Sequence, residues 1–344
     1  MVRQGEGTLK RMHISRPKLI ASVAAVLALV ALLATPQLLG SRVSDALDAL
    51  AGANRFWLGL GALGFLGGFL ATVGAWRAAL AAAGGRICPR QAAARIGVGC
   101  MVNSFAPAKL GDAVKIALCS KAIEGPGRIW TTGGVYVALA AARSLTLALL
   151  LVVASATGAM PLWPVFVIFT AVGLLAVAGA FSGRLRSHPR IAHVLGGLAA
   201  LERSPRAIAT VLGWTLAMQL TRLGGTVAVA AALGLPHPLL AALLILPALD
   251  VAASFPITPG GIGVGSGAVA VALASRGIGM SQALGVGIAI QALETLVSVT
   301  AGSLGGLYLA WPGAAVRRWT YRVATLGVAS AVAAALSVAV LNLL

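Results

Sequence analysis

Four charged residues lie inside long apolar stretches of this sequence, at Arg143, Arg222, Asp250 and Glu294. A charge at the centre of a membrane helix costs roughly 2.5 to 3.5 kcal/mol, so these side chains are expected to avoid lipid. Arginine can bind an anionic group, so Arg143 and Arg222 are candidate binding residues. Glu294 is a third candidate, because its charge must also face a cavity or a partner. The alternative is that each acidic residue only pairs with an arginine and holds helices together. Asp250 is interpreted in this second way.

The segment 96–122 brings polar residues close to a proline, and the apolar sequence on each side of Pro107 is too short for a full crossing. The pattern predicts a re-entrant hairpin. A lysine near its tip would suit a phosphate as a point charge. The alternative is that these charges anchor the base of the hairpin at the membrane surface. The candidate binding residues of this segment are Asn103, Pro107, Lys109, Asp112 and Lys115.

The stretch Ser254-Phe-Pro-Ile-Thr-Pro-Gly-Gly-Ile-Gly-Val-Gly-Ser266 interrupts apolar sequence with prolines and glycines. Proline lacks an amide donor and glycine disfavours helix, so backbone groups there are left unpaired unless protein or water satisfies them. Broken helices of this kind commonly form transporter binding sites. The alternative is a packing kink or a surface loop. The candidate binding residues of this stretch are Thr258, Pro259, Gly260, Gly261 and Ser266.

The composition is typical of a polytopic membrane protein, because 59% of the 344 residues are hydrophobic and only 10% are charged. The net charge of +18 comes from basic residues in short connections, as the positive-inside rule expects of a bacterial-type cytoplasmic membrane. The basic segment 1–18 predicts a cytoplasmic N-terminus, and no nucleic-acid partner is expected. The cysteines and histidines show no ligand spacing, so neither a metal nor another cofactor is expected.

The apolar runs predict a single transmembrane domain of the all-α class, with about seven full spans and two re-entrant helical hairpins. The predicted spans are 19–39, 56–80, 129–157, 162–181, 207–234, 283–310 and 323–344, and the predicted hairpins are 96–122 and 239–275.

The order span, span, hairpin, span occurs over 19–157 and again over 162–310. Each unit crosses the membrane an odd number of times, so the second unit must be inserted upside down relative to the first. The same Ser-Phe pair also precedes Pro107 and Pro256. The sequence therefore predicts an inverted repeat whose hairpin tips approach each other from opposite faces.

With these motifs the chain resembles the lysylphosphatidylglycerol synthase transmembrane family, also called flippase-like integral membrane proteins. Asn103, Pro107, Asp112 and Lys115 are similar to the first family motif, and Arg143 is similar to an arginine of the following span. Residues 256–264, Pro-Ile-Thr-Pro-Gly-Gly-Ile-Gly-Val, resemble the second motif closely.

Two positions depart from the family pattern. Ser266 stands where the family has a glutamate, and a later family arginine falls at Leu293 or Glu294. A pair of charges expected near the second hairpin is therefore missing or reversed. The resemblance implies movement of lipids with polar heads, such as aminoacylated phosphatidylglycerol or polyprenyl-linked sugars.

Two functions are consistent with these features. The first is a lipid flippase or transporter for an anionic-headgroup lipid, either a polyprenyl-phosphate-linked sugar or a modified phospholipid. The second is a non-transporting accessory or scaffold subunit of a complex for glycolipid or aminoacyl-lipid synthesis, with a membrane glycosyltransferase or synthase as its partner. No nucleophile–base set or nucleotide fingerprint is found in the sequence, so no catalytic residue and no enzymatic activity are predicted.

Overall fold

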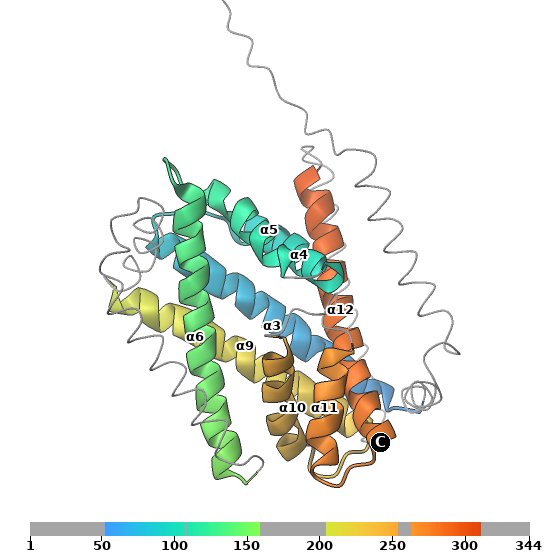
Figure 1. The fold of residues 1–344 in the computed structure, drawn as a ribbon. Helices are drawn as coiled ribbons and strands as arrows, with labels where there is room; N and C mark the ends of the chain where they lie inside the picture. The colour runs from blue at the N-terminus through green and yellow to red at the C-terminus, as the bar shows by residue number, and fades with distance from the viewer. Residues whose placement is uncertain (1–51, 107–108, 159–203, 254–262, 311–344) are drawn as a thin grey trace, which may run out of the picture. The chain divides into compact units, whose positions relative to one another are not determined.

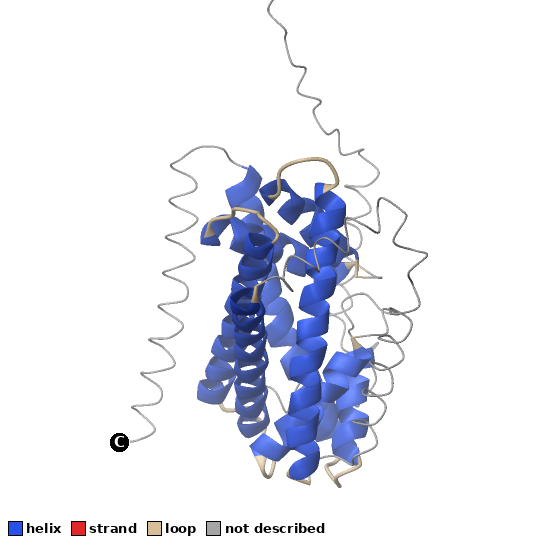
Figure 2. Ribbon diagram, turned by 90° about the vertical axis from the view of Figure 1, so that its left-hand side faces the viewer, coloured by secondary structure: helices blue, strands red, loops and turns tan. Residues whose placement is uncertain are grey.

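The computed structural model describes residues 52–106, 109–158, 204–253 and 263–310, all of which belong to the compact unit Asp45–Leu344. These ranges are helical and contain no strand (Figure 2). The α-helices are α3 (Arg55–Ala82), α4 (Pro89–Phe105), α5 (Leu110–Cys119), α6 (Arg128–Ala156), α9 (Pro205–Ala232), α10 (Pro238–Ala252), α11 (Val264–Ala274) and α12 (Met280–Ala310), and η2 (Ser120–Ala122) is a short 3₁₀ turn.

Three of the described helices, α3, α6 and α12, are long and apolar enough to cross a membrane. They coincide with the predicted spans 56–80, 129–157 and 283–310. Helix α9 covers the predicted span 207–234 and has 28 residues, but polar residues such as Arg222 keep it outside this group. The all-helical membrane class is therefore confirmed. The spans predicted at 19–39, 162–181 and 323–344 lie outside the described residues.

Two pairs of short helices stand where the hairpins were predicted. Helices α4 and α5 pack against each other, and so do α10 and α11. In Figure 1 the first pair lies near the top of α6 and the second pair lies towards its lower end. The first pair begins earlier than predicted, at Pro89, because proline is well suited to the first position of a helix. The connecting residues 107–108 and 254–262 lie outside the described ranges.

Local sequence signals set several helix ends. Ser204 caps α9 by accepting a hydrogen bond from the amide of Ala207, and Pro205 follows at the first helical position. Gly263 precedes α11 with a φ of 91°, in a region of conformational space that favours glycine. Lys109 precedes α5 with a φ of 54°, which is uncommon for a residue with a side chain.

Small residues let the long helices approach closely. A Cβ built on Gly64 of α3 would lie 2.5 Å from the Cα of Gly225 in α9, so these two backbones are in direct contact. Helix α4 packs on α12 in the same way, because a Cβ on Gly97 would lie 2.6 Å from the carbonyl oxygen of Ala301. Such small-residue contacts are typical of helix association in membranes, where hydrophobic burial gives no net drive.

The buried apolar side chains form two main clusters, one around each hairpin. The first combines α3, α4 and α6 and includes Trp76, Ile96 and Val135. The second combines α9, α10, α11 and α12 and includes Ile245 and Ile290. The buried apolar residues of the two hairpins therefore belong to different clusters, although α4 of the first hairpin also packs on α12.

Candidate functional site

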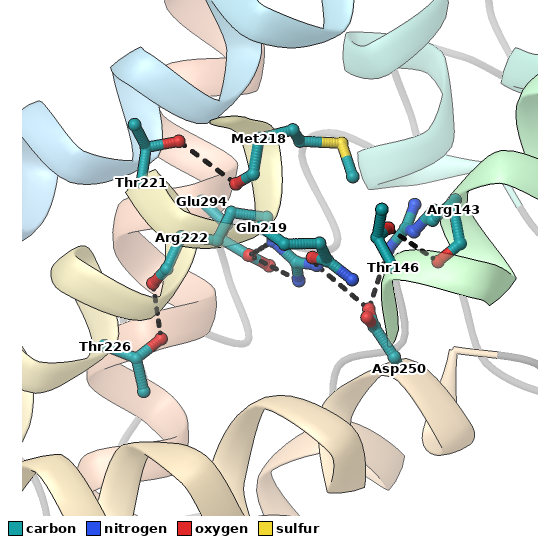
Figure 3. A network of polar contacts seen from close by, with 9 residues as sticks. All are labelled: Arg143, Thr146, Met218, Gln219, Thr221, Arg222, Thr226, Asp250 and Glu294. Carbon is teal, nitrogen blue, oxygen red and sulfur yellow. Dashed lines mark hydrogen bonds and ion pairs between the residues drawn. The ribbon is translucent and has the colours of Figure 1, made fainter. Parts of the chain in front are cut away.

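A chain of alternating charges joins four helices. Arg143 of α6 donates a hydrogen bond from Nη2 to Oδ1 of Asp250 in α10, at 2.6 Å. Arg222 of α9 donates to the same oxygen through Nη1 at 3.0 Å. Arg222 also donates to Oε1 of Glu294 in α12, through Nη2 at 3.0 Å and Nε at 3.2 Å. Figure 3 shows the resulting order Arg143, Asp250, Arg222, Glu294.

The middle of this charge chain is buried and its two ends are open. The side chains of Asp250 and Arg222 are 5% and 14% exposed. At the ends, Arg143 is 46% exposed and Glu294 is 34% exposed. The buried pair has exchanged its hydration for ion pairing, as buried charges must, whereas the terminal residues can still meet a ligand.

Neighbouring residues hold Arg222 in place. A Cβ on Gly68 of α3 would lie 2.9 Å from the Cγ of Arg222, so only glycine there leaves room for the arginine stem. Gln219, one turn earlier, accepts a contact from Nη1 of Arg222 at 3.5 Å. Gln219 is 1% exposed, and its Nε2 has no hydrogen-bond partner among the described residues. The stem of Arg222 is thus closely packed against α3, and a buried polar side chain lies beside its guanidinium.

A second polar cluster ties the first hairpin to α6. Asp112 of α5 accepts three hydrogen bonds, from Nδ2 of Asn103 at 2.8 Å, from Nζ of Lys115 at 2.9 Å and from the hydroxyl of Tyr136 at 2.8 Å. Asn103 lies on α4 and Tyr136 on α6, so one carboxylate joins three helices. Asp112 is partly buried, and a carboxylate with several donors in such a place is well satisfied and fixes its neighbours in one geometry.

Helix α6 contacts a carboxylate of each hairpin. Tyr136 and Arg143 are seven residues apart, which is about two turns, so they lie on one face of the helix. Tyr136 binds Asp112 of the first hairpin and Arg143 binds Asp250 of the second. Movement of either hairpin relative to α6 would therefore have to break a charge-assisted hydrogen bond.

A cavity of about 310 Å³ lies beside these two clusters. It is lined by the charged residues Lys115, Arg143, Arg222 and Glu294, and by the uncharged polar residues Thr72, Asn103, Ser104, Gln291, Thr295 and Ser298. Its apolar walls include Phe65, Phe69 and Leu249. A polar cavity with apolar walls can hold a charged headgroup out of contact with lipid.

The charges of the two clusters balance. The cations are Lys115, Arg143 and Arg222, and the anions are Asp112, Asp250 and Glu294. The described part of the site therefore carries no net excess of either sign. Within the same part of the chain, no group of three histidine, cysteine, aspartate or glutamate residues is placed to hold a metal ion.

The structure brings together some of the residues that the sequence singled out. The predicted residues that line the cavity are Asn103, Lys115, Arg143, Arg222 and Glu294. Asp112 lies directly behind Asn103 and Lys115, which it binds.

Two predicted residues lie elsewhere in the described structure. Lys109 is exposed and is not part of the cavity wall. Ser266 is 6% exposed, and its hydroxyl donates to the carbonyl oxygen of Gly263. Ser266 packs against α12, where a Cβ on Gly287 would lie 2.7 Å from its Cα. The remaining predicted site residues, Pro107, Thr258, Pro259, Gly260 and Gly261, lie outside the described residues.

The sequence reasoning gave too little weight to Asp250 and missed Tyr136 and Gln219. Asp250 links the two arginines, and Tyr136 links α6 to the first hairpin. An acidic residue inside an apolar run was a usable signal for Asp250. Nothing in the sequence distinguished Tyr136 from a tyrosine at the membrane surface.

The sequence of this chain matches one known protein family. The family model of the lysylphosphatidylglycerol synthase TM region matches residues 19–302. A comparison with curated protein sequences gives no match. The matched segment covers most of the chain, and it includes both helix pairs and all the residues of the two polar clusters. The chain therefore belongs to the lysylphosphatidylglycerol synthase TM region family.

Proposed function

We propose that this protein binds the headgroup of a phosphate-bearing lipid in the cavity, with the anionic phosphate at the arginines, and moves that lipid across the cytoplasmic membrane. The lipid's hydrocarbon chains would stay in the bilayer while the headgroup passes through the polar interior. The membrane lipid is then the principal partner, and neither a catalytic residue nor a cofactor is part of the proposal.

The observation that carries this proposal is the half-exposed guanidinium of Arg143 in the cavity wall. Arg143 uses one nitrogen, Nη2, to bind Asp250, and its other donors make no hydrogen bond to the described residues. A guanidinium with free donors suits a phosphate, because its planar fork matches two phosphate oxygens. A charged side chain among membrane helices costs insertion free energy, and such residues usually have a functional role.

The proposed mechanism uses the two hairpins as gates on opposite sides of the cavity. It assumes the inverted repeat predicted for 19–157 and 162–310, with the N-terminus in the cytoplasm and each hairpin returning to its own side of the membrane. Support comes from the separate apolar core of each hairpin and from the close pairing of α3 with α9, the second predicted span of each unit. Breaking the Tyr136–Asp112 contact would release the first gate, and breaking the contacts of Arg143 and Arg222 with Asp250 would release the second.

A second function is favoured by the charge balance of the site. Every charged side chain in the two clusters already has a partner of opposite sign, as expected of a purely structural network. On this reading the protein is a non-transporting scaffold for a membrane glycosyltransferase or lipid synthase. The open ends of the charge chain weigh against it, because a structural network gains nothing from leaving Arg143 half exposed.

The test is reconstitution of purified protein into vesicles with chain-labelled lipids, followed by quenching of the label in the outer leaflet. Arg143→Gln keeps a hydrogen-bonding side chain but removes the charge. A charge-assisted hydrogen bond is worth about 1.5 to 3 kcal/mol, so translocation of a phosphate-bearing lipid should slow about tenfold or more. Leu145→Ala is the matched control, because Leu145 lies on the same helix, is 60% exposed and does not line the cavity.

The outcomes separate the two functions. Equal rates for wild type and Arg143→Gln would remove Arg143 from the site. If the wild-type protein moves no lipid, while a membrane synthase loses activity when this protein is absent, the scaffold function is correct and the transport function is wrong.

A further inference from the structure

The charge chain ends in opposite charges, and both ends face the same cavity. Arg143 stands at one end and Glu294 at the other (Figure 3), and both residues line the cavity. They are the two most exposed members of the chain, at 46% and 34%. The site therefore offers a ligand both a cationic and an anionic contact.

The atoms left free at each end are suited to binding. Both hydrogen bonds from Arg222 to Glu294 reach the same oxygen, Oε1. The other carboxylate oxygen of Glu294 accepts no hydrogen bond from the described residues. At the opposite end, the guanidinium donors of Arg143 other than Nη2 make no hydrogen bond to the described residues. One end can thus accept hydrogen bonds from a cation while the other donates hydrogen bonds to an anion.

A headgroup that carried only negative charge would fit this site poorly. Binding its phosphate at Arg143 would place it in the same cavity as the open carboxylate of Glu294, and like charges repel strongly in a medium of low dielectric constant. Arg222 does not cancel this effect fully, because it also neutralises Asp250. A positive group on the headgroup would turn the repulsion into attraction.

We infer that Glu294 determines specificity by selecting a zwitterionic headgroup, whose phosphate binds Arg143 and whose ammonium group binds the free oxygen of Glu294. This inference rests on the proposed function and narrows its substrate class. A primary ammonium has three donors, so it can bind a carboxylate oxygen and still contact a neighbouring polar wall residue such as Thr295.

The test compares two lipids that differ only in the ammonium group. Chain-labelled phosphatidylethanolamine and its N-acetyl derivative have the same phosphate and chains, but acetylation removes the positive charge. They are reconstituted with the full-length protein in vesicles of a neutral galactolipid, so that the bulk lipid carries neither charge. Wild type should move the zwitterionic lipid about tenfold faster, a ratio that corresponds to about 1.4 kcal/mol.

Three variants make the test specific for the charge of Glu294. Glu294→Gln has the same shape and still accepts a hydrogen bond from Arg222, and it should abolish the preference between the two lipids. Glu294→Asp keeps the charge and should retain at least part of the preference. Leu296→Ala changes a residue of α12 that is 59% exposed, and it should leave the preference unchanged.

Each outcome decides the inference. Equal rates for the two lipids in wild type would overturn it, and so would a Glu294→Gln variant that slows both lipids equally. If wild type moves neither lipid, the proposed transport function fails, and the inference is then judged by equilibrium binding of the same two lipids in detergent. Tighter binding of the zwitterionic lipid that disappears in Glu294→Gln would support it, and equal binding would refute it.

Discussion

Replacement of Asp250 by asparagine tests whether the charge chain holds the helices together. Asp250 is 5% exposed and accepts hydrogen bonds from Arg143 and Arg222 on a single oxygen. Asparagine keeps the shape and a carbonyl acceptor but removes the negative charge. Arg222 would then remain buried with Glu294 as its only carboxylate among the described residues.

The expected size of the effect follows from the burial of each partner. Removing one partner of a buried ion pair costs about 3 to 5 kcal/mol, because the other charge stays buried without compensation. The contact with Arg143 contributes less, since that side chain is 46% exposed and solvent screens it. Most of the loss therefore comes from Arg222, and we expect Asp250→Asn to lower the free energy of unfolding by about 3 kcal/mol.

The measurement is equilibrium unfolding of the purified protein in mixed micelles, followed by tryptophan fluorescence as the proportion of denaturing detergent rises. Val251→Ala is the matched control. Val251 is the next residue of α10 and is 52% exposed, so its truncation should change the free energy of unfolding by less than about 0.5 kcal/mol. Arg143→Gln should also cost less in the Asp250→Asn background than in wild type, by about 1 kcal/mol, because the two residues are in contact.

Two results would refute this reasoning. One is an Asp250→Asn variant as stable as the Val251→Ala control, which would mean that the arginines find other partners. The other is an Arg143→Gln effect of the same size in both backgrounds, which would mean that the hydrogen bond between Arg143 and Asp250 contributes nothing to stability.

Two further predictions test the packing and the cavity. Gly64→Ala should lower the free energy of unfolding by about 1 to 3 kcal/mol, because its Cβ would lie 2.5 Å from the Cα of Gly225. The control is Gly224→Ala, which should be neutral or stabilising because nothing lies within 4 Å of its Cβ. Equal effects of the two substitutions in the same unfolding assay would contradict the close contact between Gly64 and Gly225. In a variant whose exposed Cys88 is replaced by serine, a small maleimide should label Cys100, which lines the cavity, and spare the fully buried Cys119, as mass spectrometry can show. Labelling of Cys119 at the same rate as Cys100 would contradict the burial of Cys119.

Apolar run length was sufficient to predict the described membrane helices to within a few residues. The run that became α6 was predicted as 129–157 and is Arg128–Ala156. This worked because a membrane span must satisfy all its backbone hydrogen bonds internally, which leaves helix as the default for any long apolar segment. The same rule identified the two places where helix had to stop, although their exact connections, 107–108 and 254–262, lie outside the described residues.

The binding residues were predicted unevenly. Arg143, Arg222 and Glu294 stood out because a charge in an apolar run is costly, and the structure places all three at one cavity. Lys109 stood out for its position near a motif, yet it is exposed and is not one of the residues that line the cavity. Proximity in sequence to a motif was a weaker signal than the energetic cost of burial.

The sequence by itself determined that this chain is helical, that it belongs in a membrane and that four charged side chains must avoid contact with lipid. Only the tertiary structure decided which charges pair, that Asp250 joins two arginines, and that Arg143 and Glu294 are left open at the two ends. The reason is physical. Insertion cost is a property of each residue in its own helix, whereas pairing depends on how residues from α6, α9, α10 and α12 meet once small residues have allowed the helices to pack.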